Sequence, residues 1–142
     1  MNELQALMGI ECLKAIDSIL ASRAEIHAVY RKAFAGSSDV KLLDPASCAA
    51  PVGFSPNYAY CPVLFRDFET RERVCLALRE KCNVFARRYF YPLVTDFPPY
   101  AYGKGTCPVA EDAARRILTL PTYYGLSAED ARAIAENILE ML

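Results

Sequence analysis

Apolar residues recur at helical spacing from residue 2 to residue 35, and this pattern predicts one long N-terminal helix. Its apolar positions are Leu7, Ile10, Leu13, Ile16, Leu20, Ile26, Val29, Tyr30 and Phe34. Asn2 is a suitable cap, and Gly36 followed by two serines ends the helix. Such a helix is about 50 Å long, whereas a compact domain of this size is about 35–40 Å across. We therefore expect it either to break near residues 18–22 or to pack its N-terminal half on something outside this domain.

The rest of the chain reads as short strands separated by helices. The expected strands span residues 57–65, 83–94 and 120–123, and the expected helices span residues 68–82, 109–118 and 127 to about 141. Segments rich in proline and glycine, residues 37–56 and 95–106, are expected to be loops. This order predicts an α+β fold in which a small sheet of about three strands is covered by helices. We expect one domain over residues 1–142, with residues 1–35 as its long helix and residues 57–142 as its α+β body.

We expect the segment 83–94 to be the part of the chain that recognises a ligand. As a strand it places Phe85, Arg87, Tyr89 and Tyr91 on one face. Arg87 and its neighbour Arg88 near the end of the strand indicate an edge that faces an anion. The alternative is a strand that packs its aromatic residues beneath a helix, with its arginines paired to nearby glutamates.

Composition and charge narrow the classes of partner. The net charge is −1, with 54% hydrophobic and 23% charged residues, so the chain has globular composition and no overall field for nucleic acid or anionic membrane. An RNA-binding sandwich, suggested by arginines and aromatics on one strand, requires a basic face that this balance opposes. There is neither an apolar run long enough to cross a bilayer nor a basic signal-peptide start. We expect a soluble, cytoplasmic protein that binds neither nucleic acid nor membrane.

Six cysteines and one histidine carry little chemistry in this pattern. No Cys-x-x-Cys pair is present, and His27 is the only histidine, so the spacing of a zinc site is missing. We expect the cysteines to be buried and reduced rather than metal ligands, redox partners or nucleophiles. His27 is expected to be a solvated helix residue, and we predict no metal site.

Four short motifs follow one another along nearly the whole chain. They are Met-Asn-Glu-Leu-Gln-Ala at residues 1–6 with Gly9, Arg-Arg-Tyr-Phe-Tyr-Pro-Leu at residues 87–93, Cys-Pro-Val-Ala-Glu at residues 107–111, and Leu-Pro-Thr-Tyr at residues 120–123 followed by Gly-Leu-Ser-Ala-Glu-Asp at residues 125–130. In this order they resemble the C-terminal small domain of the DegT/DnrJ/EryC1/StrS family of pyridoxal-phosphate-dependent sugar aminotransferases. The resemblance implies the small domain of a fold-type I aminotransferase, in which residues 1–35 form the connecting helix.

The resemblance also implies what this chain contributes. Arg87, Tyr89 and Tyr91 match family positions at the mouth of the nucleotide-sugar pocket, where an arginine can pair with a phosphate and tyrosines can contact a sugar. The family's Schiff-base lysine lies in a larger domain that precedes this one, so we expect no catalytic residue and no cofactor in this chain alone, and pyridoxal phosphate in the complete enzyme. A nucleotide-linked sugar is the expected ligand, and a homo-oligomer through the first helix is expected. The alternative is a stand-alone interaction or self-association module without enzymatic activity.

Overall fold

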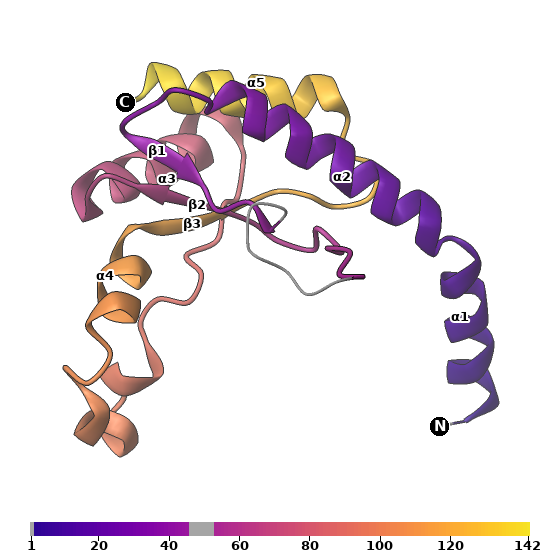
Figure 1. The fold of residues 1–142 in the computed structure, drawn as a ribbon, viewed down its shortest axis with the longest axis horizontal. Coiled ribbons are helices and arrows are strands. Elements are labelled where there is room, and N and C mark those ends of the chain that lie inside the picture. Colours follow the sequence, from indigo (N-terminus) through magenta and orange to yellow (C-terminus); the bar gives the residue numbers. More distant parts are fainter. Residues whose placement is uncertain (1, 46–52) are drawn as a thin grey trace.

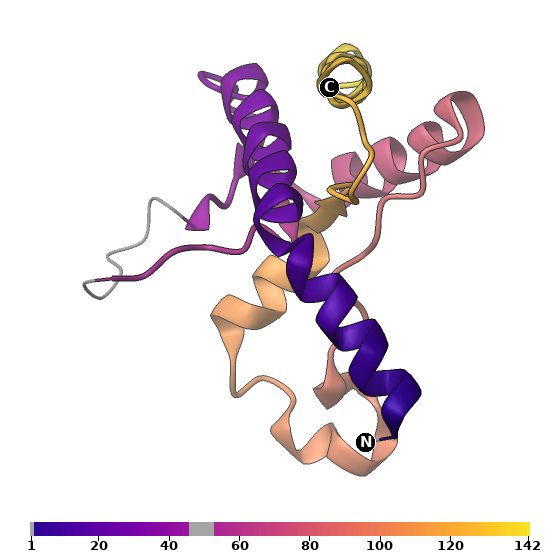
Figure 2. The same ribbon diagram turned by 90° about the vertical axis from the view of Figure 1, so that its right-hand side faces the viewer.

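The computed structural model describes residues 2–45 and 53–142 and shows an α+β fold around a three-stranded antiparallel sheet, as predicted. The strands are β1 (Val40–Leu42), β2 (Cys61–Phe65) and β3 (Ile117–Leu120), in the spatial order β1-β2-β3. Two helices, α2 (Ile16–Ala33) and α5 (Ala128–Glu140), pack against each other above the sheet, and α3 (Phe68–Cys82) contacts α5 and two strands (Figures 1 and 2). The core lies between these helices and the sheet.

The predicted N-terminal helix is two helices that meet at Ala15. Helix α1 (Glu3–Lys14) begins with a capping box in which the Asn2 side chain accepts a hydrogen bond from the Gln5 amide at 2.9 Å. It ends at Ala15, just before the range expected for a break, and α2 then starts in a different direction (Figure 1). None of the residues Glu3–Lys14 is buried, so α1 projects from the body as an arm.

Helix α2 supplies one side of the core. Ile26, His27 and Tyr30 are buried, and Phe34 follows them on the same side. The Tyr30 hydroxyl donates a hydrogen bond to the Pro121 carbonyl at 3.2 Å and so ties the helix to the chain just after β3. Opposite α2, helix α5 buries Ala131, Ile134, Ala135 and Ile138 at the helical spacing that its sequence predicts.

All three strands differ from the sequence prediction, and β2 begins at Cys61 instead of residue 57. Strand β1 lies inside residues 37–56, which we expected to be a loop throughout, and Val40 pairs with Phe65 of β2. Strand β3 precedes the expected residues 120–123 because α4 (Pro108–Arg116) runs directly into it. Ile117 already has extended backbone angles, and all four residues of β3 are buried.

Segment 83–94 is not a strand, which corrects the prediction on which recognition was based. Asn83 ends α3 in the left-handed conformation (φ 54°), and of the described residues that follow, Arg87 makes a single bridge to Thr119. Two 3₁₀ turns then come next, η2 (Val94–Asp96) and η3 (Pro98–Gly103). Pro92 cannot donate to a strand ladder, and the prolines of η3 continue the irregular path.

The remaining helices agree with the sequence. Helix α3 spans the predicted residues 68–82, and its Asp67 cap accepts a hydrogen bond from the Thr70 amide at 2.7 Å. Ser127 caps α5 by accepting from the Asp130 amide at 2.9 Å. In the described part of the chain no helix is both long and apolar enough to cross a membrane.

Candidate functional site

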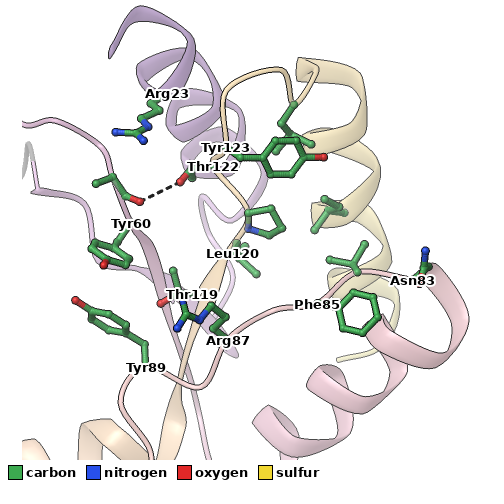
Figure 3. A pocket seen from close by; sticks show the side chains of 15 residues that line it. Arg23, Tyr60, Asn83, Phe85, Arg87, Tyr89, Thr119, Leu120, Thr122 and Tyr123 are labelled. Atoms are coloured by element: carbon green, nitrogen blue, oxygen red, sulfur yellow. Dashed lines mark hydrogen bonds between the residues drawn. The ribbon is translucent and has the colours of Figure 1, made fainter. Parts of the chain in front are cut away.

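A pocket of about 510 Å³ lies where α2, α5, β3 and the segment after α3 meet (Figure 3). Its walls come from segments far apart in the sequence, with Arg23 on α2, Tyr60 before β2, Arg87 and Tyr89 after α3, and Thr119 on β3. The volume falls within the range of small-molecule sites, about 300–1,000 Å³. Two of the three predicted site residues, Arg87 and Tyr89, are therefore in one place.

Arg87 is held in the pocket by its backbone. Its bridge to Thr119 places both residues in directly opposite positions, so their side chains lie on the same side of the pairing. The Arg87 guanidinium is exposed, and among the described residues it has no acidic partner. A guanidinium remains charged at any physiological pH and suits a carboxylate or phosphate that binds through two oxygens.

Arg88, unlike Arg87, has an acidic partner within the described fold. Its guanidinium donates two hydrogen bonds of 2.7 Å to the two carboxylate oxygens of Glu72, and these bonds lower the pKa of that carboxyl. The alternative in which the arginines pair with glutamates therefore describes Arg88, whose charge is neutralised within the fold. It does not describe Arg87.

Two tyrosines form one wall beside Arg87. The rings of Tyr60 and Tyr89 lie 4.8 Å apart between centroids, tilted by 38°, and Tyr89 also stacks on Phe90 at 4.3 Å. Tyr60 is half exposed at the pocket. Both phenol groups bring ring surface and a hydroxyl to the same end of the pocket (Figure 3).

Sequence reasoning missed two polar groups of this site. The Nε atom of Arg23 and the Oγ1 atom of Thr119 are buried without a hydrogen-bond partner among the described residues. Both residues line the pocket. Buried polar atoms normally have partners, so two unpartnered ones in a single pocket mark it as a place where a polar ligand can supply them.

The pocket is also one-sided in charge. Arg23 and Arg87 line it, and the described lining residues include neither aspartate nor glutamate. In a partly enclosed site such an excess of positive charge favours an anion. This arrangement can bind and orient an anionic ligand, and it offers no paired acid and base for proton transfer.

Tyr91 lies elsewhere, so the prediction that it shares a face with Arg87 and Tyr89 is wrong. Its ring is 6.1 Å from that of Phe68 and 4.9 Å from the guanidinium carbon of Arg71. It lines a second pocket of about 320 Å³ together with Lys104 and Glu111. The strict alternation of a strand was the reason for grouping the three residues, and this segment is not a strand.

Arg71 is a fully buried cation next to Tyr91. Its Nε donates to the Arg115 carbonyl at 2.9 Å, its Nη1 pairs with Glu72, and its guanidinium carbon lies 5.0 Å from the Phe68 ring centre. Burial lowers the pKa of Arg71. Because the Glu72 carboxylate serves both Arg71 and Arg88, this cluster belongs to the architecture of the fold.

His27 supports the pocket wall from behind. Its Nε2 donates a hydrogen bond to the Tyr60 carbonyl at 2.9 Å, and its ring lies 4.8 Å from that of Tyr58. The side chain is fully buried, which corrects the expectation of a solvated residue, and burial lowers the pKa of His27. Thr122 adds a second tie by donating to the Ala59 carbonyl at 3.3 Å. These two bonds fix the backbone that carries Tyr60.

The five described cysteines differ in their exposure to solvent. Cys61 is fully buried, Cys75 and Cys82 are half-buried, and Cys12 and Cys107 are exposed, which corrects the expectation that all are buried. The sixth, Cys48, lies outside the described residues. Burial raises the pKa of the Cys61 thiol to about 12.

Comparison with known proteins gives one family. The model of the DegT/DnrJ/EryC1/StrS aminotransferase family matches residues 1–139. A dTDP-4-amino-4,6-dideoxy-D-glucose transaminase of Escherichia coli is 29% identical over 144 residues, covering 98% of this chain and 38% of the relative. A GDP-perosamine synthase of Escherichia coli O157:H7 is 29% identical over 140 residues, covering 99% and 36%. The chain thus spans little more than a third of these curated relatives.

Solved structures show the same fold. PseC of Helicobacter pylori, an aminotransferase involved in the biosynthesis of pseudoaminic acid, superposes with a TM-score of 0.83 at 22% identity, covering 99% of this chain and 37% of that one. DesI, solved in the presence of its TDP-sugar product, gives a TM-score of 0.81 at 27% identity, covering 99% and 36%. Both matches extend over nearly all of the fold described above.

Proposed function

This chain belongs to the DegT/DnrJ/EryC1/StrS aminotransferase family, and from that premise we propose that it is the C-terminal part of a pyridoxal-phosphate-dependent nucleotide-sugar aminotransferase. The Escherichia coli relatives carry the names of enzymes for dTDP- and GDP-linked amino sugars and are more than twice as long as the matched part. In this proposal the chain helps to bind the nucleotide sugar and does not transfer the amino group by itself.

The observation that carries the proposal is Arg87, which lies without an acidic partner, among the described residues, beside Tyr89 and Tyr60. Arg87 binds a phosphate oxygen of the nucleotide sugar, and the Tyr89 ring and hydroxyl contact the ligand next to it. Arg88 is excluded from this role because Glu72 already binds it. A contact from Tyr91 stays a prediction, and the second pocket is where it would occur.

The lysines of this chain do not fit the covalent site that the family's cofactor requires. Pyridoxal phosphate supplies the carbonyl through which an amino group is exchanged, and the lysine that holds it must lie in a pocket that lowers its pKa. All five lysines here (Lys14, Lys32, Lys41, Lys81 and Lys104) are exposed. We therefore assign the Schiff-base lysine to the remaining part of the complete enzyme.

Helix α1 supports a second role, in association. Its apolar side chains Leu4, Leu7, Met8, Ile10 and Leu13 are between 54% and 69% exposed, which is a large apolar surface to leave in water. We propose that this face packs against a second copy. The same surface favours the alternative of a self-association module, should the complete protein prove to lack aminotransferase activity.

The test uses the complete polypeptide that contains or accompanies this chain, purified with pyridoxal phosphate. It is assayed for amino transfer from dTDP-, GDP- and UDP-linked amino sugars, with Arg87→Ala as the variant and Arg132→Ala, an exposed residue of α5, as the control. Loss of one phosphate contact lowers kcat/KM about tenfold, which equals about 1.4 kcal/mol. Absence of transfer with all three sugar classes contradicts the proposal. Equal kinetics for Arg87→Ala and the control contradict the role of Arg87.

A further inference from the structure

We propose that Arg88 is a positioning residue whose ion pair with Glu72 directs its neighbour Arg87 into the pocket. The proposal rests on the proposed function for what Arg87 binds there, but its evidence is the way in which residues 84–91 are attached to the fold. Arg88 and Glu72 are not among the described lining residues of the pocket, so their role is to hold a residue that is.

The segment that carries Arg87 has little backbone structure to hold it. At its start the Val84 amide donates to the Leu78 carbonyl at 3.0 Å, and its β pairing within the described chain is one bridge, between Arg87 and Thr119. A single bridge fixes one point but does not extend into a ladder on either side. Side-chain contacts therefore contribute to deciding which residues of the segment face the pocket.

Side chains leave this segment in two directions. Arg87 and Tyr89 line the pocket (Figure 3), whereas Arg88, which lies between them in sequence, reaches Glu72 on α3. Ala86, two residues before Arg88, packs against the core. Neighbouring residues of an extended chain point to opposite sides, so an attachment of Arg88 to α3 turns Arg87 toward the pocket.

The ion pair also selects between two equivalent side chains. Arg87 and Arg88 have the same length and charge, so a shift of the segment by one residue would offer Arg88 to the pocket in place of Arg87. Such a shift would take Arg88 away from Glu72 and would turn Tyr89 to the other side. The contact with Glu72 therefore favours the register in which Arg87 and Tyr89 line the pocket together.

Glu72 is a fixed anchor for this selection. Its carboxylate accepts two hydrogen bonds of 2.7 Å from Arg88, one on each oxygen, and this double contact sets the orientation of the guanidinium. The same carboxylate pairs with Arg71, which is fully buried and lies 5.0 Å from the Phe68 ring centre and 4.9 Å from that of Tyr91. Because a buried cation is costly to leave unpaired, Arg71 keeps Glu72 in place.

The first measurement is hydrogen–deuterium exchange with mass spectrometry on the complete polypeptide that contains or accompanies this chain. Arg88→Gln should speed exchange at the Arg87 amide at least tenfold, in peptides that cover residues 84–88, because the bridge to Thr119 opens more often. Peptides from α5 should exchange as before, since the pair between Glu72 and Arg71 remains. Arg88→Lys keeps the charge but not the double hydrogen bond, so its exchange rate should be intermediate.

The matched control is Arg66→Gln. Arg66 is also exposed and also paired with acids, at 3.0 Å from Asp39 and 3.0 Å from Asp67, but it is not among the described residues of the pocket. Its loss should leave exchange in residues 84–88 unchanged. Urea unfolding should give nearly the same midpoint for both variants, because exposed ion pairs contribute little to stability.

Amino transfer by the complete enzyme tests the consequence. Arg88→Gln should raise KM for the nucleotide sugar about fivefold, with a smaller change in kcat and none in KM for the amino donor. The double variant Arg87→Ala/Arg88→Gln should be no worse than Arg87→Ala alone, because a residue that acts through Arg87 has no effect once Arg87 is removed.

Three results overturn the proposal: exchange in residues 84–88 that Arg88→Gln leaves unchanged, faster exchange that Arg66→Gln reproduces, or kinetic losses that add fully in the double variant. The exchange measurement does not depend on amino transfer. Faster exchange in Arg88→Gln together with an inactive complete protein would uphold the positioning of Arg87 and remove the proposed function. An active enzyme in which Arg88→Gln leaves exchange unchanged would do the reverse.

Discussion

Arg87 and Thr119 exchange both of their backbone hydrogen bonds. The Arg87 amide donates to the Thr119 carbonyl at 3.1 Å, and the Thr119 amide donates to the Arg87 carbonyl at 2.8 Å. This pair fixes one point of a segment that otherwise lacks strand structure in the described chain. The guanidinium and the threonine hydroxyl therefore keep a fixed relationship to each other, which is the property that a binding site requires.

The Thr119 hydroxyl should oppose stability and favour binding. Its Oγ1 is buried and has no partner among the described residues, so Thr119→Val should leave the free energy of unfolding unchanged or raise it by up to about 1 kcal/mol. The same change should weaken binding of the nucleotide sugar by the complete enzyme, because Thr119 lines the pocket. Thr122→Val is the matched control, because the Thr122 hydroxyl donates to the Ala59 carbonyl, and its loss should cost about 1 kcal/mol. Urea unfolding measures the change in stability of each variant. A large loss of stability in Thr119→Val would contradict the conclusion that the Thr119 hydroxyl has no hydrogen-bond partner within the described fold.

His27 should make the fold less stable below about pH 6.5. Burial lowers the pKa of His27 in the folded state, so between that value and the unfolded value the unfolded chain binds the additional proton. The contribution of neutral His27 to the free energy of unfolding is therefore fully present above the pKa of the unfolded state. It is lost as the pH falls from that value toward the lower pKa of the folded state. His27→Gln keeps a donor for the Tyr60 carbonyl but does not titrate, so its stability should vary less between pH 7.5 and pH 5.5 in urea unfolding.

His27 is the only histidine in the sequence, so a difference in pH dependence between the unchanged chain and His27→Gln can be assigned to protonation of this one side chain. The carboxyls of Asp67, Glu72 and Asp112 have lowered pKa values and titrate at more acidic pH. Equal slopes for the two proteins between pH 7.5 and pH 5.5 would show that protonation of His27 does not oppose folding.

Glu72 should matter more to stability than its partial exposure suggests. Its carboxylate binds Arg88 and also pairs with Arg71, whose side chain is fully buried. Glu72→Ala leaves the Arg71 charge buried without compensation, and we expect a loss of about 2–4 kcal/mol. Glu80→Ala, on the exposed side of the same helix, should change stability by less than about 0.5 kcal/mol. Chemical unfolding measures the loss of stability in each variant. An equally small loss for Glu72→Ala and Glu80→Ala would show that the buried Arg71 cation does not require the Glu72 carboxylate.

The apolar face of α1 should make the chain associate. Sedimentation equilibrium at micromolar concentration should show a dimer, since a two-fold pairing buries the same face of both copies. Leu7→Glu/Ile10→Glu should give a monomer. Lys14→Glu breaks the exposed ion pair between Lys14 and Glu11 but leaves the apolar face of α1 intact, so this variant should remain a dimer. A monomer for the unchanged chain would refute pairing through α1.

The purified chain should form no internal aldimine with pyridoxal phosphate. Its five lysines are exposed, and a solvated ammonium is a weak nucleophile at neutral pH. Titration with the cofactor, followed by borohydride reduction and peptide mapping, should show no stoichiometric adduct on one lysine. A single fully modified lysine would mean that this chain holds the cofactor itself.

Local signals were enough to predict the helices. The residues of α3 are those expected, because Asp67 caps its start and the chain turns at Asn83. A sheet of three strands was also predicted, but β1 was not expected, the expected strand 83–94 is absent, and β3 begins three residues before its expected start. Aromatic residues in segment 83–94 suggested a ladder, whereas those rings pack with side chains instead, as Tyr89 does with Tyr60. Periodicity cannot distinguish these two uses of an aromatic residue.

The site was predicted in part. Arg87 and Tyr89 were identified because their motif is contiguous in sequence, and the pocket contains both. Arg23 gives no such signal, since an arginine on an amphipathic helix is usually solvated. Its place in the pocket depends on how α2 packs over residues 59–60 and 119–123, which is a property of tertiary structure. His27 was misjudged for the same reason.

The uneven exposure of the thiols makes the chain suitable for site-directed labelling. Cys12 on α1 and Cys107 at the start of α4 are open to reagent, whereas the buried Cys61 stays a thiol and does not react. With Cys48, Cys75 and Cys82 changed to serine, a nitroxide on each of the two exposed cysteines would report the separation between α1 and α4. That separation, measured before and after a partner is added, turns the position of α1 into a spectroscopic observable.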